Sequence, residues 1–129
     1  MRRKVKKLTR RNQGDSWLEI CGRLRRAVVG WVNYYALADA RSHMAHLDGY
    51  MRRRIRQLIW VQWKTSKNRY RNLRRRGVSE YWSVRLAGTS KGPWRTSLSP
   101  PIHDAVSNAY LERVKLVSFR KRYDKLRRT

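Results

Sequence analysis

Residues 42–64 read SHMAHLDGYMRRRIRQLIWVQWK and predict the longest helix of the chain. One narrow sector of this helix is apolar and contains Met44, Leu47, Met51, Ile55 and Leu58. The other side is basic and aromatic, with Arg52, Arg53, Arg56, Trp60, Trp63 and Lys64. An exposed indole ring normally has a binding partner, so we favour a ligand-binding face over a merely solvated one. Burial of Trp60 or Trp63 by another element is the alternative.

The sequence around this helix carries uncompensated positive charge. No acidic residue occurs between Asp48 and Glu80, and the cations in that interval are Arg52, Arg53, Arg54, Arg56, Lys64, Lys67, Arg69, Arg71, Arg74, Arg75 and Arg76. Across the chain, 33 Lys and Arg face 8 Asp and Glu, which gives a net charge of +25. Arg forks onto phosphate and stacks on bases, so this composition indicates a nucleic-acid partner. Self-repulsion on this scale predicts a chain that a polyanion stabilises.

The composition also limits the class of protein. The chain has 129 residues and is 40% hydrophobic, with six Trp and seven Tyr, so it can bury one modest core and is not a disordered basic tail. The single Cys21 excludes an internal disulfide and a cysteine-based zinc finger. No apolar run approaches the roughly 18 residues of a membrane-spanning helix, and the N-terminus lacks a secretory signal. We therefore expect no membrane partner, and a location in the bacterial cytoplasm or an organelle matrix.

We expect three regions along the chain. Residues 1–14 are basic and predict a flexible arm or linker, residues 15–118 a helical domain, and residues 119–129 a basic C-terminal tail. A helix should begin near Ser16, where Ser16 and Glu19 form an S-x-x-E capping box. Its apolar stripe consists of Trp17, Ile20, Leu24, Val28, Trp31 and Tyr35.

The remaining elements are shorter. Helices are expected over 66–76, closed by Gly77, and over 79–87, closed by Gly88, with glycine as a left-handed C-cap in each case. Residues 88–101 predict a loop, and Ser99 then caps a last helix. The core face of that helix is Ile102, Ala105, Val106 and Ala109. The predicted fold is all-α, a small bundle of about four to five helices with long basic loops and basic termini.

Few residues suggest catalysis or metal binding. His43 and His46 could share a helix face with Asp39 or Asp48 as a metal site, but a solvated His pair is the favoured interpretation. The eight acidic residues are scattered, and Cys21 has no evident His partner. The sequence therefore predicts no catalytic residue, no metal and no cofactor.

The loop KGPWR, residues 91–95, places Trp94 between Lys91 and Arg95. A ring between two cations suits contact with RNA, where unpaired bases stack on aromatic side chains. A Trp that plugs the core, with exposed cations beside it, is an equally good interpretation.

Six short elements occur in an order and spacing that resemble the group II intron maturases. They are GWVNYY at 30–35, LDGYMRRRIR at 47–56, WVQWK at 60–64, RYRNL at 69–73, KGPWR at 91–95, and SNAYL with LVS at 107–118. The resemblance covers about residues 5–123. One departure is Lys115, which stands where the family often has Gly before Leu-Val-Ser.

The resemblance implies a maturase domain, also called domain X or the thumb, which in the family follows a reverse transcriptase. The chain has neither the Tyr-x-Asp-Asp polymerase signature nor the Cys pairs of the family's endonuclease module. Such a domain binds the intron RNA, assists its folding for splicing, and holds a template–primer duplex. The ribozyme performs the splicing chemistry.

The leading hypothesis is thus a non-catalytic domain that binds structured RNA, with group II intron RNA as the partner. The predicted contact residues are Arg52, Arg53, Arg56, Trp60, Trp63, Lys64, Lys67, Arg69, Arg71, Arg74, Arg75, Arg76, Lys91, Trp94 and Arg95. One alternative is a thumb or split subunit that contacts an RNA–DNA template–primer duplex beside a reverse transcriptase palm. Another is a structural RNA-binding or chaperone module. A duplex-DNA binder ranks low because no helix-turn-helix pattern is evident.

Overall fold

The computed structural model describes residues 1–10, 14–35 and 41–127, and the regular elements of these residues are all helices. They are α1 (Arg2–Leu8), α2 (Trp17–Tyr35), α3 (Arg41–Gln62), α4 (Ser66–Arg75), α5 (Glu80–Ala87), α6 (Pro93–Thr96), α7 (Pro100–Ala105), α8 (Asn108–Arg113) and α9 (Phe119–Arg127). The predicted all-α class is confirmed. The helices outnumber the four to five expected because several of them are only one or two turns long.

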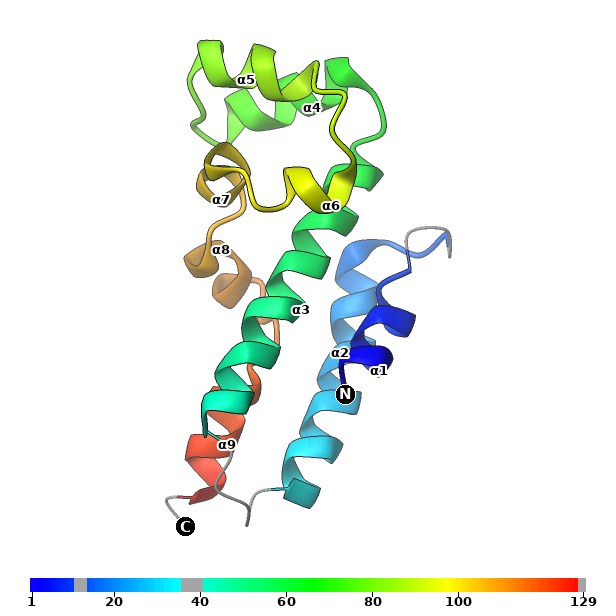
Figure 1. The fold of residues 1–129 in the computed structure, drawn as a ribbon, viewed down its shortest axis with the longest axis vertical. Coiled ribbons are helices and arrows are strands. Elements are labelled where there is room, and N and C mark those ends of the chain that lie inside the picture. Colours follow the sequence, from blue (N-terminus) through cyan, green and yellow to red (C-terminus); the bar gives the residue numbers. More distant parts are fainter. Residues whose placement is uncertain (11–13, 36–40, 128–129) are drawn as a thin grey trace.

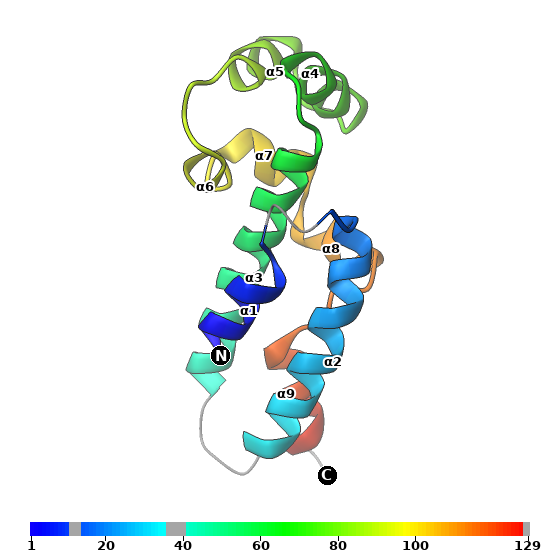
Figure 2. The same cartoon turned by 90° about the vertical axis from the view of Figure 1, so that its right-hand side faces the viewer.

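The helices form a rod with a small group of helices at one end. Helices α2, α3 and α9 run side by side, and α1 lies against both α2 and α3 (Figure 2). Helices α4 and α5 pack together at the end of the molecule farthest from α9, next to α7, while α6 lies against α3 (Figure 1). The long helix α3 therefore connects the rod to this outer group.

The core forms where the predicted apolar faces meet. Ile20, Leu24 and Val28 of α2 are fully buried, and every residue of the predicted α3 sector is at most 1% exposed. The expected start of α2 is also confirmed, because the backbone N–H of Glu19 donates to Ser16 Oγ at 3.3 Å. Helix α3 begins one residue before, and ends two residues before, the predicted limits.

Both ends of the chain form helices. Instead of a flexible arm, Arg2–Leu8 is helix α1, with Val5 fully buried in the core. The C-terminal region forms α9, which buries Phe119 and Tyr123. In each case one or two apolar side chains among many cations are enough to dock a helix. The proposed division at residues 14 and 118 stays a prediction, and residues 11–13, 36–40 and 128–129 lie outside the described residues.

The segment after α5 departs from the prediction in three respects. Gly77, between α4 and α5, has the expected positive φ of 92°. Gly88, directly after α5, has φ −93° and is not left-handed. Part of the expected loop is the short helix α6. The predicted last helix stops at Val106, and Ser107 starts α8 by accepting a hydrogen bond from the Tyr110 N–H at 3.1 Å. Ala109 is consequently exposed on α8 rather than in the core.

A buried carboxylate joins α3 to α9. Asp48 is 3% exposed and accepts hydrogen bonds from the Phe119 N–H at 2.6 Å and the Arg120 N–H at 3.1 Å. It also accepts a bond from the Ser118 hydroxyl at 2.7 Å. These donors belong to the first turn of α9, where backbone N–H groups have no partner within the helix and favour an anion. Asp48 thus caps a helix that begins about seventy residues later in the chain.

We predict that Asp48→Ala lowers the free energy of unfolding by about 2–3 kcal/mol, because it removes a charged cap and leaves buried donors unpaired. Urea unfolding at fixed ionic strength measures the change. The control is Asp104→Asn, because the Asp104 carboxylate is exposed and makes no hydrogen bond to the described residues. This variant should stay within about 0.5 kcal/mol of wild type. Equal effects of the two variants would contradict the capping role.

The buried Cys21 provides a second test of the core. Burial raises the pKa of its thiol to about 11. Because only the thiolate reacts readily, Cys21 should resist alkylation at about pH 8 in the native chain and react at the ordinary rate in denaturant. Rapid native labelling would show that the N-terminal part of α2 is not packed as described.

Candidate nucleic-acid interface

Consecutive arginines on α3 point in different directions because each residue turns about 100° around a helix. Arg53 reaches α6, where its Nε donates to Ser97 Oγ at 3.1 Å and its Nη2 to the Trp94 carbonyl at 2.9 Å. Arg54 reaches the end of α1, where its Nε donates to Thr9 Oγ1 at 2.9 Å and its Nη2 to the Thr9 carbonyl at 3.3 Å. Both side chains therefore hold neighbouring helices in place.

Arg56 is buried rather than presented to a ligand. It is 3% exposed, and it donates from Nε to the Val106 carbonyl at 2.8 Å and from Nη2 to Asn108 Oδ1 at 2.7 Å. Burial, together with the nearby charge of Arg52, lowers the pKa of Arg56 to about 10, so the guanidinium remains protonated at neutral pH. The prediction that Arg56 is a surface contact is wrong, because this side chain fastens α3 to the α7–α8 connection.

The two tryptophans at the end of α3 also face inward to different degrees. Trp60 is 1% exposed, so its predicted place on an outer face is wrong. The Arg69 guanidinium lies 4.5 Å from the centre of the Trp60 ring, and its Nε donates to the Trp60 carbonyl at 3.1 Å. Trp63 is half-buried and contacts Trp60, with ring centres 6.0 Å apart. The Trp60 and Trp63 rings, together with Arg69, connect α3 to α4.

Arg76 has a similar internal role. Its guanidinium lies 4.5 Å from the Tyr110 ring centre and 5.6 Å from that of Trp63. Its Nη1 donates to the Ala105 carbonyl at 3.4 Å. Arg76 therefore links the end of α4 to α7 and α8.

The KGPWR segment agrees with the second interpretation of its sequence, a Trp packed on the protein with exposed cations beside it, and contact with RNA stays a prediction. Trp94 is half-buried against α3, with the Arg53 guanidinium 3.5 Å from its ring centre and the Tyr50 ring centre 5.9 Å away. Lys91 and Arg95 are exposed on either side. The ring packs on the protein, and only the two cations are fully presented to solvent.

Helix α4 carries a regular row of exposed cations. Lys67, Arg71, Arg74 and Arg75 occur at i, i+4, i+7 and i+8, so they share one side of the helix, which we call the α4 basic face. Arg74 donates to the Val78 carbonyl at 3.0 Å. The other three have no hydrogen-bond or ion-pair partner among the described residues. Lys64, just before α4, is exposed as well.

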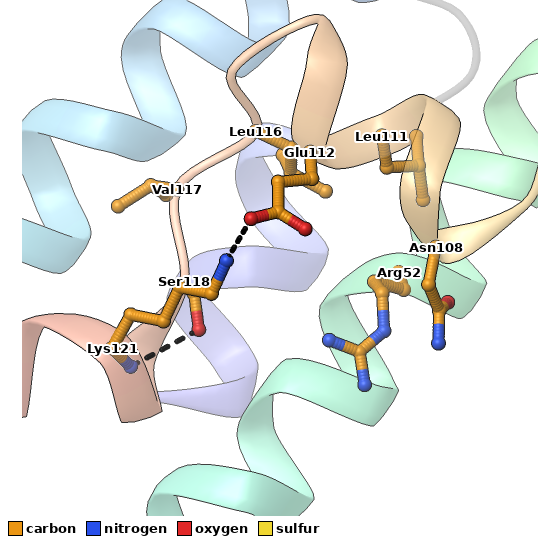
Figure 3. A pocket seen from close by; sticks show the side chains of 8 residues that line it. All are labelled: Arg52, Asn108, Leu111, Glu112, Leu116, Val117, Ser118 and Lys121. Atoms are coloured by element: carbon orange, nitrogen blue, oxygen red, sulfur yellow. Dashed lines mark hydrogen bonds and ion pairs between the residues drawn. The ribbon is translucent and has the colours of Figure 1, made fainter.

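Arg52 is separated from the α4 basic face. It is half-buried and lines a hollow of about 150 Å³ together with residues of α8 and α9 (Figure 3). On the opposite side of this hollow Lys121 forms an ion pair with Glu112 (Figure 3). The hydrogen bond and charge of Lys121 lower the pKa of Glu112. The predicted contact residues thus do not form one surface.

Two aromatic residues that the sequence analysis did not select are exposed on α5. Tyr81 is 59% and Trp82 51% exposed, with ring centres 5.1 Å apart. The Arg85 guanidinium lies 5.2 Å from the Tyr81 ring centre and bonds its hydroxyl. Adjacent aromatics followed by a cation on a short helix are the sequence signal that could have indicated this group.

Neither a metal site nor a membrane span is found in the parts of the chain that the structure describes. No group of three His, Cys, Asp or Glu side chains there could hold a metal ion. Of the proposed ligands, His43 contacts Trp31, Asp48 caps α9, and Asp39 lies outside the described residues. No described helix is long and apolar enough to cross a membrane.

Comparison with protein families identifies a match. The model of the family described as "Group II intron, maturase-specific domain" matches residues 1–82. No curated protein matches the chain. The match extends from α1 into α5, so it includes all of α3 and the α4 basic face. The resemblance of the motifs at 91–95 and 107–118 lies beyond it and stays a prediction.

Because Arg56 is buried and Arg71 is exposed, their substitutions should change the free energy of unfolding by different amounts. Arg56→Gln should lower the free energy of unfolding by about 2 kcal/mol, because it removes charged hydrogen bonds in a buried site. Arg71→Gln removes the same charge from the exposed α4 basic face and should change stability by less than about 0.5 kcal/mol. Urea unfolding of both variants tests this pair. A larger loss for Arg71→Gln would contradict the assignment.

Proposed function

We propose that this chain, which belongs to the group II intron maturase-specific domain family, binds folded group II intron RNA and assists its splicing. The observation that carries the proposal is the α4 basic face. It lies within the matched residues and belongs to a helix at one end of the molecule (Figure 1), and three of its four cations have no hydrogen-bond or ion-pair partner among the described residues. Family membership indicates a role connected with group II introns, and the exposed cations supply a means of contact.

The proposed contacts are a revised set of the predicted residues. Phosphate contacts come from exposed or half-buried cations that do not hold helices together, namely Arg52, Lys64, Lys67, Arg71, Arg75, Lys91 and Arg95, with Arg74 beside them. Arg53, Arg56, Arg69 and Arg76 act indirectly, because they orient the helices that carry those cations. Trp63 and Trp94 contribute at most their exposed edges.

The mechanism is electrostatic capture combined with recognition of shape. Each phosphate that a cation neutralises releases a counterion, so affinity arises largely from charge and falls with salt. Contacts to phosphates position a protein without reading sequence, and double-stranded RNA is recognised mainly by its form. A rigid arrangement of α4 on α3 would therefore select RNA whose backbones match the spacing of the cations. In this proposal the chain has no catalytic residue and the RNA performs the chemistry.

Binding to a folded group II intron RNA across a salt series tests the proposal. An unrelated structured RNA, an RNA–DNA hybrid and duplex DNA serve as competitors. We expect a preference for the intron that persists at physiological salt. Equal binding to all four nucleic acids, lost together as salt rises, would contradict specific recognition. Preference for the hybrid would instead support a thumb that holds a template–primer duplex.

Paired charge variants locate the surface. Arg71→Gln with Arg75→Gln should weaken intron binding and make the slope of log K against log salt less steep by about 0.7–0.9 for each contact removed. Arg25→Gln with Arg26→Gln removes the same charge from exposed positions on α2 and is the matched control. If both pairs change the slope equally, the α4 basic face has no special role and net charge alone determines binding.

A further inference from the structure

An exposed indole ring borders two hollows between α5 and α7. Trp82 lines both of them, and so do Pro100 and Pro101 at the start of α7. Their volumes are about 400 and 330 Å³. The ring is 51% exposed although the chain has a well-formed core that buries other large side chains. Pro100 is exposed and Pro101 is buried, so Trp82 and the rigid Pro100 ring present the apolar surface, which suits a flat ligand.

The polar groups at the two hollows differ in charge. The larger one is bordered by Arg85 and Lys91, both exposed. The smaller one is bordered by Ser79 and by Asp104, whose carboxylate makes no hydrogen bond or ion pair among the described residues. Cations at one side favour a phosphate, and a carboxylate at the other can accept a hydrogen bond from an N–H group of a base.

Neighbouring contacts hold the indole and its cation in position. Tyr81 meets Trp82 edge to face, and Arg85 bonds the Tyr81 hydroxyl while lying near its ring. The Trp82 side chain therefore has a neighbour on α5 that restricts it before a ligand binds. Preorganisation of this kind reduces the entropy that binding must overcome.

We infer that Trp82 and Pro100 form a stacking site for one unpaired nucleotide of the bound RNA. Its base lies on the Trp82 ring, and its phosphate lies near Arg85 and Lys91. A base within a duplex is already stacked on both faces, so only an unpaired base can use this site. A net charge of +25 and the two flanking cations favour a polyanion over a protein partner. The inference rests on the proposed RNA-binding function, and it adds recognition of single strands to capture by the α4 basic face.

Binding of the full chain to two matched probes tests the stacking site. One probe is a short single-stranded RNA of mixed sequence, and the other has the same phosphates but abasic sugars at its central positions. The wild type should bind the base-bearing probe more tightly. Trp82→Ala should weaken that binding by roughly 5- to 150-fold, the range for loss of one base–aromatic contact, and leave abasic binding unchanged. Trp82→Phe should keep most of the preference.

Further variants separate stacking from charge. Lys91→Gln, which leaves the Arg85–Tyr81 bond intact, should weaken binding of both probes to a similar extent. Leu98→Ala, which removes another side chain that is 57% exposed, should affect neither. An unchanged preference for the base-bearing probe in Trp82→Ala would overturn the inference. If that variant also binds intron RNA as the wild type does, only the stacking site fails. If the wild type binds no RNA, both the stacking site and the proposed function are wrong.

Discussion

The fold depends on polar side chains of α3 that satisfy backbone groups at the ends of other helices. Short helices leave a large share of their N–H and C=O groups without partners, and several helices of this chain are one or two turns long. Asp48 supplies acceptors to the start of α9, Arg54 supplies donors to the end of α1, and Arg56 binds the carbonyl that ends α7. Helix α3 therefore fixes where these helices lie as well as providing a core face. Without those bonds the small helices would present unsatisfied groups next to an apolar core, which is costly.

This arrangement divides the arginines into two groups with different roles. Arg53, Arg54 and Arg56 donate to carbonyl or hydroxyl oxygens, which satisfies their hydrogen bonds but gives them no ion pair with an acidic side chain of the described residues. The interior cations consequently add to the repulsion from exposed cations on α4. Binding of a polyanion to the exposed group relieves this repulsion and stabilises the folded chain by mass action. The charge that makes the free chain less stable is the same charge that would make RNA binding favourable.

The sequence predicted the parts of the fold that depend on local pattern. Periodicity and capping residues located α2, α3 and α4 to within a few residues, because an apolar stripe and a polar cap are properties of consecutive residues. The failures depend on contacts distant in sequence. Arg56 and Trp60 lie on the basic side of α3 in a helical wheel, yet the segment that buries Arg56 comes about fifty residues later. The place of Gly88 after a helix predicted a left-handed glycine cap, but its φ of −93° is one that other residues also adopt. For the candidate site, the exposed cations of α4 were foreseen, whereas Trp82 was not, since its exposure depends on the placement of α7.

The residues that the family model matches are fewer than the residues that the fold needs to be stable. The match ends at Trp82, but the groups that satisfy buried side chains of α3 lie beyond it. Asp48 needs the first turn of α9, Arg56 needs Val106 and Asn108, and Arg53 needs Ser97 and the Trp94 carbonyl. A chain cut at residue 82 would lose the helices that cover Asp48 and Arg56, and it would leave part of the apolar face of α3 open to water, which is costly. The matched residues therefore carry the family pattern, while the residues that follow make it stable. The LDGYMRRRIR segment of this chain is accordingly explained by helix capping and by bonds that hold neighbouring helices.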